Sequence, residues 1–362
     1  MIYFFVFILS YLLIRIGEQD KQNGRFFYTF LILSVVILSL FGGLRDDTVG
    51  ADTSAYPVEV FEFAQGDHTF EEYLLFSILI EPLYVLLCYV TTHFICNDFH
   101  VWLTVCQAVI IVPLFIGAVR MRKFIPVSAF IFFFCLLFYH STLNIQRQWM
   151  AVSIIFLGFT YLLLDNRLKT FVILSIIAFF IHRSSFFSII FIPIFYFEKN
   201  VYNRWLVIGS IVLLLAFNTV LSGVSSILNM DKYDQYASGG DWESSFSISE
   251  FLIRVVLLFM ILSFRKKNRD DLMYYNVLTI LLIEFVLNLL QIWSRYMGRL
   301  GVYAFILYIP FLSYYIETSA EKNRKRLYYT IWVFMSIGYW LLVYIEKNAG
   351  YTIPYKSEVL GL

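Results

Sequence analysis

Charged residues are scarce in this chain. Of its 362 residues, only 15% are Asp, Glu, Lys or Arg, whereas a soluble globular domain carries roughly 25%. The formal net charge is +1, and a balance so near zero argues against a nucleic acid or another polyanion as the partner.

Cysteine is rare as well. The four cysteines lie in or beside apolar stretches without CxxC spacing, which predicts buried thiols rather than a disulfide framework or a zinc site.

The motifs of several enzyme classes are also missing. The sequence contains no Walker A loop, no HExxH pair and no GxSxG elbow, which excludes the chemistries that depend on them. Asp46 and Asp47 form an acidic pair, but adjacent aspartates are common on polar loops. We therefore expect no metal and no cofactor.

Long apolar runs dominate what is present. Hydrophobic residues make up 60% of the chain, and runs such as 127–139 and 151–164 recur from end to end. A transmembrane helix needs about 20 predominantly apolar residues, so we predict an all-α, polytopic membrane protein. Residues 1–14 lack a basic leader and a small-residue cleavage site, and are expected to stay as the first span. The candidate spans are 1–14, 26–44, 73–95, 99–119, 125–141, 149–164, 170–181, 185–197, 204–221, 249–264, 271–292, 300–316 and 327–345.

Lys and Arg indicate which connections face the cytoplasm, because short cytoplasmic loops hold an excess of both. Six connections are basic, and together they hold 18 of the 27 Lys and Arg residues. These six, which we place in the cytoplasm, are 15–25, 120–123, 165–169, 198–204, 265–270 and 317–326. The connections left for the outer side are 45–72, 142–148, 182–184, 222–248, 293–299 and the tail after residue 346.

An interruption at Glu81-Pro82 bears on the number of crossings. The acidic loop 45–72 and the basic turn 120–123 belong on opposite sides, yet two apolar segments separate them. Proline removes a helical hydrogen bond and glutamate is costly in lipid, so we predict that 73–95 enters and leaves on the outer side.

The resulting prediction is a single transmembrane domain over residues 1–362. It has about 12 transmembrane helices plus the re-entrant element, with both termini outside. Its two larger outward-facing loops are 45–72 and 222–248.

Arginine, rather than lysine, occupies the outer ends of the predicted spans. Only Lys232, Lys347 and Lys356 fall on that side. Long cationic side chains reach lipid headgroups readily, but a planar guanidinium also binds phosphate oxygens through two hydrogen bonds, which lysine cannot do. The preference for arginine therefore favours a phosphate-bearing ligand at the outer face. The arginines concerned are Arg45, Arg147, Arg183, Arg254, Arg295 and Arg299.

Polar residues at helical spacing indicate faces that are turned away from lipid. His140, Asn144 and Arg147 make one such stripe, and His182 lies between two predicted spans beside Arg183. A longer stripe, which requires a continuous helix, comprises Glu284, Asn288, Gln291, Arg295, Arg299 and Tyr303.

Aromatic residues gather in the outer loop 222–248. Tyr233, Tyr236 and Trp242 suit packing against sugar rings, and an aromatic belt at the membrane interface is an equal alternative.

The stretch GLRDDTVGADTSAY, residues 43–56, resembles the first outer loop of the EpsG-like, Wzy-type polysaccharide polymerases. That loop carries an arginine, then Val-Gly-x-Asp-Thr, then a tyrosine. The residues that match it here are Arg45, Val49, Gly50, Asp52, Thr53 and Tyr56. Further pieces similar to the family follow in the same order: Glu81-Pro82-Leu83-Tyr84, Gln146-Arg147-Gln148, His182 with Ser184, Lys232-Tyr233 with Tyr236, and a late outward arginine.

This resemblance implies a multi-pass enzyme of the bacterial cytoplasmic (inner) membrane, with its active site facing the periplasm or the outside. Such proteins join oligosaccharide repeat units that are carried on undecaprenyl pyrophosphate. The growing glycan leaves its lipid pyrophosphate for a sugar hydroxyl on another lipid-linked unit. The implied partners are these lipid-linked oligosaccharides, membrane lipid, a chain-length regulator and a flippase, but no nucleic acid.

The implied transfer needs a group that stabilises the departing pyrophosphate and a base for the acceptor hydroxyl. Arginines can serve the first need without a metal. The arginines expected to stabilise the pyrophosphate are Arg147, Arg295 and Arg299. Arg45 is a weaker candidate for the same role. The candidate bases, among which the choice is open, are Asp52, Glu81 and His182. The tyrosines expected to contact substrate are Tyr56, Tyr233, Tyr236 and Tyr303.

Two rival hypotheses stay open. A glycosyltransferase that uses a polyprenyl-phosphate sugar would hold a metal at Asp46 or Asp47, so metal dependence would identify it. A flippase or other transporter of lipid-linked oligosaccharides would carry charged residues along a path open to both sides, whereas the polar residues here gather outward. Export without chain lengthening would identify that second rival.

Overall fold

The computed structural model describes residues 2–19, 24–196, 205, 208–209, 212, 247–268, 270–292 and 295–362. Within these ranges, all regular secondary structure is helical. The chain forms two compact units, one made of Met1–Phe186 with Val333–Leu362 and the other of Phe187–Trp332. Our prediction of a single transmembrane domain stays a prediction.

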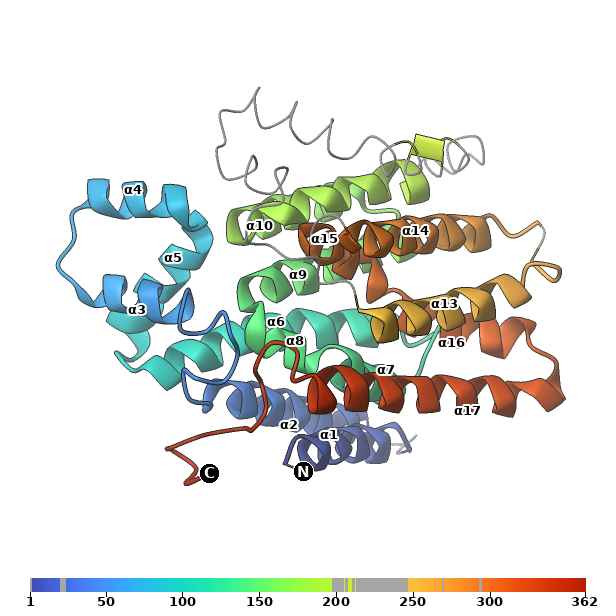
Figure 1. Ribbon diagram of the computed structural model, residues 1–362, viewed down its shortest axis with the longest axis horizontal. Helices are drawn as coiled ribbons and strands as arrows, with labels where there is room; N and C mark the ends of the chain where they lie inside the picture. The colour runs from blue at the N-terminus through green and yellow to red at the C-terminus, as the bar shows by residue number, and fades with distance from the viewer. Residues whose placement is uncertain are drawn as a thin grey trace. The chain divides into compact units, whose positions relative to one another are not determined.

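Five helices of the first unit pack side by side in a row (Figure 1). α1 packs on α2, α2 on α6, α6 on α9, and α9 on α10, while α7 packs on α1 and α6. The apolar faces of α6 and α9 bury Trp102 and Trp149 completely. The helices of this unit before residue 182 are α1 (Ile2–Gln19), α2 (Gly24–Gly43), α3 (Pro57–Gln65), α4 (Phe70–Leu79), α5 (Pro82–Val90), η1 (Thr91–Ile95), α6 (Phe99–Arg120), α7 (Val127–Leu137), α8 (Tyr139–Asn144), α9 (Gln146–Asp165) and α10 (Leu168–Ile181).

In the second unit, the chain turns back on itself after α14. Gly298 and Gly301 allow the two neighbouring helices to approach closely, because a Cβ at Gly298 would collide with Gln291 and one at Gly301 would lie 3.6 Å from Glu284. The chain therefore does not form the continuous helix on which the stripe from Glu284 to Tyr303 depended. The elements after residue 182 are η2 (Arg183–Ile190), η3 (Ile192–Tyr196), α13 (Ile248–Ser263), α14 (Leu272–Leu289), η4 (Leu290–Ile292), α15 (Arg295–Phe305), α16 (Tyr308–Ser319), α17 (Lys322–Tyr339) and η5 (Trp340–Glu346).

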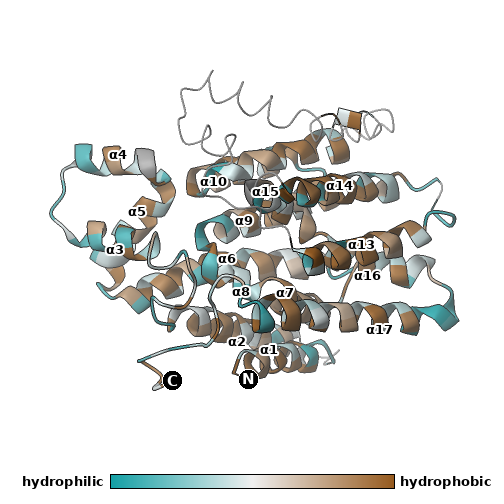
Figure 2. Ribbon diagram, in the orientation of Figure 1, coloured by the Kyte–Doolittle hydropathy of each residue, from teal (hydrophilic) through white to brown (hydrophobic). Residues whose placement is uncertain are grey.

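Within the described residues, six helices are long and apolar enough to cross a membrane, or seven if the bent pair α15 and α16 forms one span. Apolar residues dominate these helices, whereas the first turn of α17 is hydrophilic (Figure 2). The prediction of an all-helical, multi-pass membrane protein is supported. The count of about 12 spans stays a prediction, because most of 204–221 and of the loop 222–248 lies outside the described residues.

The predicted segment 73–95 is broken at the residues expected. α4 begins at a capping box formed by Thr69 and Glu72, and its last residue is Leu79. Ile80 is extended, and Pro82 then occupies the first turn of α5, where a missing N–H costs least. The break is confirmed, and the dip of this segment into a membrane stays a prediction.

The predicted loop 45–72 is more ordered than expected, since it contains α3 and the first turn of α4.

Connections that we assigned to one side of the membrane also meet in the first unit. At one end, the loop after α2 bonds both to Asn144 and to the C-terminal tail, through Asp52 N to Asn144 Oδ1 and Ala51 N to Gly350 O. The connections assigned to the cytoplasm pair among themselves, as Arg120 does with Asp165 at 2.6 Å. The structure thus brings together connections that we assigned to the same side, and the assignment of the sides stays a prediction.

We expect residues 67 and 122 to lie on opposite sides of the membrane. Asp67 and Arg122 are both exposed, and only Cys96 among the native cysteines is exposed. In a Cys96→Ser background, a membrane-impermeant maleimide added to intact cells with a permeabilised outer layer should label Asp67→Cys and spare Arg122→Cys. Equal labelling of the two variants would contradict the re-entrant assignment of 73–95.

Candidate functional site

The loop that follows α2 is folded by its own polar motif. Arg45 is fully buried, and its guanidinium donates hydrogen bonds to the carbonyl oxygens of Gly42, Val49 and Leu143. Thr53 Oγ1 donates to two of the same oxygens, those of Val49 at 2.9 Å and Leu143 at 3.2 Å. Buried carbonyls are costly without partners, so these two side chains stabilise the loop. We infer a structural role for Arg45 in place of the substrate contact expected from the sequence.

Gly50 is the residue of this loop that a side chain would disturb most. Its φ is +99°, a region that favours glycine, and a Cβ there would collide with the carbonyl oxygen of Leu143. Gly50→Ala should therefore lower the free energy of unfolding by about 1–3 kcal/mol, measured as thermal unfolding of the purified protein in detergent. Gly338→Ala is the control, because nothing lies within 4 Å of the added Cβ and alanine favours a helix. Equal unfolding temperatures for the two variants would contradict this account.

The C-terminal tail holds the same loop from its other side. Gly50 N donates to Tyr351 O at 2.9 Å, and Asp46 N donates to Lys356 O at 3.0 Å. Asp46 Oδ1 in turn accepts from Glu358 N at 2.9 Å. The Asp46 carboxylate thus has a structural partner, and no group of three or more His, Cys, Asp or Glu residues that could hold a metal occurs in the described part of the chain.

Three predicted residues meet beside this loop: Glu81, Arg147 and His182. Glu81 Oε2 accepts from Arg147 Nη1 at 2.6 Å, and Glu81 Oε1 lies 3.1 Å from His182 Nδ1. Glu81 Oε1 also accepts from the backbone N–H of Arg183 at 3.2 Å. The exposed fractions of the Glu81, Arg147 and His182 side chains are 8%, 14% and 19%. We call these three residues the Glu81 cluster.

Each member of the Glu81 cluster lies at the end of a helix or in a break between two helices. Glu81 immediately precedes Pro82 in the break between α4 and α5, and Arg147 is the second residue of α9. The chain enters α9 through Ile145, whose φ and ψ of −90° and 57° are not helical. His182 is extended and directly follows α10. Since helix ends expose polar groups that need partners, these three positions suit a polar cluster.

Two tyrosines pack against the guanidinium of Arg147. Its central carbon lies 4.0 Å from the ring centre of Tyr56 and 5.6 Å from that of Tyr84. Tyr56 is 38% exposed, whereas Tyr84 is completely buried. A cation above an aromatic face is stabilised electrostatically, so the two rings help to fix the orientation of the guanidinium.

The surroundings of Glu81 keep it ionised. Burial alone would raise the pKa of its carboxyl, but the hydrogen bond with His182 and the charge of Arg147 prevail and lower that pKa from 4.5 to about 2. Glu81 lies in the break of the predicted re-entrant segment 73–95, outside the helices of the described residues that are long and apolar enough to cross a membrane. Because the folded-state pKa is below the ordinary value, the ionised carboxylate stabilises the cluster fully above about pH 4.5, and this stabilisation is lost as the pH falls through about 2.

Other predicted residues lie elsewhere. His140 is buried with Thr352 and Trp340 as hydrogen-bond partners, and the non-helical Ile145 separates it from Arg147, so the shorter stripe does not form one face. Asp52 is half-buried, one turn before Tyr56.

The remaining predicted residues belong to the second unit or to its undescribed part. Arg295 starts α15, Arg299 is half-buried on the same helix, and Tyr303 is buried. Tyr233 and Tyr236 lie outside the described residues. Their expected contacts with substrate stay predictions.

Tyr84 was not predicted as a member of the site. Tyr84 follows Glu81 by three positions, within the same Glu-Pro-Leu-Tyr piece that resembled the family. That spacing on the first turn of α5 was a usable signal. Arg183, named from the sequence among the outward arginines, contacts Glu81 through its backbone N–H, and no sequence signal exists for that contact.

Comparison with known proteins supports the family resemblance. The family model described as the EpsG family matches residues 25–357, nearly the whole chain and every residue of the Glu81 cluster. No curated protein and no solved structure matches the chain.

Proposed function

The chain belongs to the EpsG family, and from this membership we propose that it is a Wzy-type polysaccharide polymerase. It joins oligosaccharide repeat units, carried on undecaprenyl pyrophosphate, at the outer face of the bacterial cytoplasmic membrane. The observation that supports this proposal most is the Glu81 cluster, in which a carboxylate, a guanidinium and an imidazole from three segments are in contact. A chain-length regulator and a flippase are its proposed partners.

Arg147 stabilises the leaving group. As the bond between the anomeric carbon and the pyrophosphate oxygen breaks, negative charge grows on that oxygen. Among the described residues, Arg147 donates a hydrogen bond only through Nη1, to Glu81. Its other N–H groups can therefore bind phosphate oxygens. Glu81 and Tyr56 keep the guanidinium in place meanwhile, and Arg295 and Arg299 are further proposed cations.

His182 is the base. Ionised Glu81 only accepts hydrogen bonds, so Nδ1 of His182 donates to it. The lone pair of the neutral ring then lies on Nε2. That nitrogen takes the proton of the acceptor hydroxyl while the hydroxyl oxygen attacks the anomeric carbon. Glu81 orients the imidazole and stabilises the imidazolium that forms, so it acts as a positioning residue rather than as the base.

The length of the surface glycan tests this function. A strain that lacks the gene should display single repeat units where the parent strain displays long chains, and the wild-type gene should restore the long chains. An unchanged length distribution would contradict polymerisation. Loss of all surface glycan would identify a flippase or another transporter instead.

A further inference from the structure

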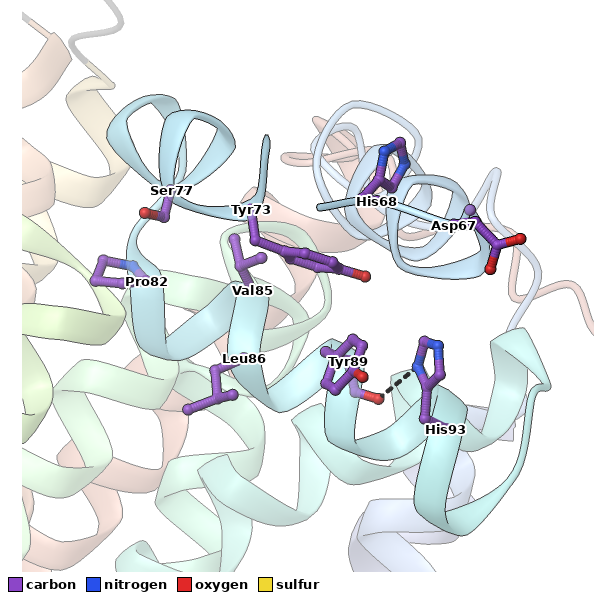
Figure 3. Close-up of a pocket in the computed structure, with 10 residues that line it drawn as sticks. Asp67, His68, Tyr73, Ser77, Pro82, Val85, Leu86, Tyr89 and His93 are labelled. Carbon is purple, nitrogen blue, oxygen red and sulfur yellow. Dashed lines mark hydrogen bonds between the residues drawn. The ribbon is translucent and has the colours of Figure 1, made fainter. Parts of the chain in front are cut away.

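A pocket of 490 Å³ lies between the helix pair α4 and α5 and the turn after α3 (Figure 3). Its volume is within the roughly 300–1,000 Å³ typical of small-molecule sites. Pro82 forms part of its wall, so the pocket reaches the residue next to Glu81. The polar side chains that line it are Asp67, His68, Tyr73, Ser77, Tyr89 and His93.

Stacked rings hold the polar groups of the pocket in place. His68 stacks on Phe63 at 4.0 Å, and Phe63 stacks in turn on Phe76 of α4 at 4.0 Å. On the opposite wall, the ring of His93 stacks on Tyr89 at 4.1 Å. A wall fixed in advance loses little conformational freedom when a ligand binds.

Two hydrogen-bonding groups of the pocket have unused capacity. The buried hydroxyl oxygen of Tyr73 has no hydrogen-bond partner among the described residues, and the hydroxyl points into the space between His68 and His93 (Figure 3). His93 Nδ1 lies 3.0 Å from the carbonyl oxygen of Tyr89, to which it donates. Nε2 of the neutral ring is then an acceptor. The pocket therefore offers both a donor and an acceptor.

The charge of the pocket argues against a phosphate group as its occupant. Neither lysine nor arginine occurs among its described lining residues, and Asp67 adds a carboxylate. A pyrophosphate would meet repulsion there, whereas it would be attracted to Arg147. Aromatic walls with interspersed hydrogen-bonding groups suit sugar rings, which present apolar faces and polar edges.

We propose that this pocket binds the uncharged sugar rings of the acceptor repeat unit and so determines which glycan is extended. The inference rests on the proposed polymerase function, because the lining residue Pro82 directly follows Glu81 of the cluster that we assign to catalysis. Sugars held along α4 and α5 would place an acceptor hydroxyl toward Glu81 and His182, while the pyrophosphate of the donor lies at Arg147.

Protection of an introduced thiol tests the proposal. Leu86 lines the pocket and is 52% exposed, whereas Phe94 is 76% exposed and is not among the lining residues. Leu86→Cys and Phe94→Cys are each made in the Cys96→Ser background and purified in detergent. Maleimide labelling is followed with three probes: oligosaccharide released by mild acid from the lipid-linked pool of the host, bare undecaprenyl pyrophosphate, and inorganic pyrophosphate.

The released oligosaccharide should slow labelling at position 86 and not at position 94, and neither pyrophosphate should slow it. Adding Tyr73→Phe should raise the oligosaccharide concentration for half-protection about two- to tenfold, the range expected for one hydrogen bond.

Absence of protection by the oligosaccharide would overturn the proposal, and so would protection by the bare lipid alone. If the wild-type protein polymerises without such protection, only the pocket assignment fails. Protection in a protein that does not polymerise leaves a sugar site and removes the polymerase function.

Discussion

Arg147→Lys is expected to abolish most polymerisation, nearly as fully as Arg147→Ala. The guanidinium donates to Glu81 through one nitrogen, packs on Tyr56, and has further N–H groups for a departing pyrophosphate. A lysine ammonium is a point charge that cannot keep the first partner and also bind a phosphate through a planar fork. The loss of transition-state stabilisation should be on the order of 2–4 kcal/mol, or roughly 30-fold to 1,000-fold in rate.

The measurement for Arg147 is glycan chain length formed from purified lipid-linked repeat units. Each variant is first brought to the wild-type level in the membrane. Arg122→Lys is the matched control, because Arg122 is exposed and lies at the end opposite the Glu81 cluster. If Arg147→Lys polymerises as well as the wild type, the assignment of Arg147 to the leaving group is wrong.

Glu81→Gln should damage stability and activity together. It removes the carboxylate from a largely buried ion pair, which typically costs about 3–5 kcal/mol because the remaining charge is left without a partner. The double variant Glu81→Gln with Arg147→Gln removes both charges, so it should be more stable than Glu81→Gln alone, although it stays inactive. Thermal unfolding in detergent and chain-length analysis measure the two effects.

The stability that Glu81 contributes should decrease only at acidic pH, as the pH falls through about 2. Glu81 stays ionised above about pH 4.5 because its folded-state pKa is about 2, so Glu81 itself adds no pH dependence between roughly pH 5 and 8. Glu59→Gln, at an exposed position of α3, should leave stability and activity unchanged. Equal stability of Glu81→Gln and the wild type would contradict the ion pair.

Local backbone chemistry explains which parts of the fold were predictable. Proline removes a helical hydrogen bond and glutamate is costly in lipid, so the break could be predicted from Glu81 and Pro82 together, whereas Pro113 alone lies inside the continuous helix α6. The reversal after α14 coincides with the predicted connection 293–299, although η4 and the start of α15 contain no proline. The close packing of α15 on α14 depends on Gly298 and Gly301. The sequence does not show this role, because it does not show that Gln291 lies opposite Gly298.

The residues of the Glu81 cluster could be predicted from the sequence, but their contacts could not. Sequence chemistry selected Glu81, Arg147 and His182 individually, but the partner of each lies 66 to 101 residues away, and no local pattern pairs them. For Arg45, the sequence predicted a contact with substrate, but its partners are backbone carbonyls. Every residue has such a carbonyl, so the sequence could not indicate these partners. An arginine at the end of a predicted span therefore looks the same whether it binds a phosphate or the backbone.

Reconstitution tests the polymerase function most directly. The purified protein is placed in liposomes with lipid-linked repeat units as the only glycan source, and both the product lengths and the released undecaprenyl pyrophosphate are measured. A ladder of glycans should form, with one undecaprenyl pyrophosphate released for each new glycosidic bond, and Arg147→Ala should form none. Unchanged single repeat units with no lipid pyrophosphate released, from protein whose thermal unfolding shows that it is folded, would contradict the polymerase assignment.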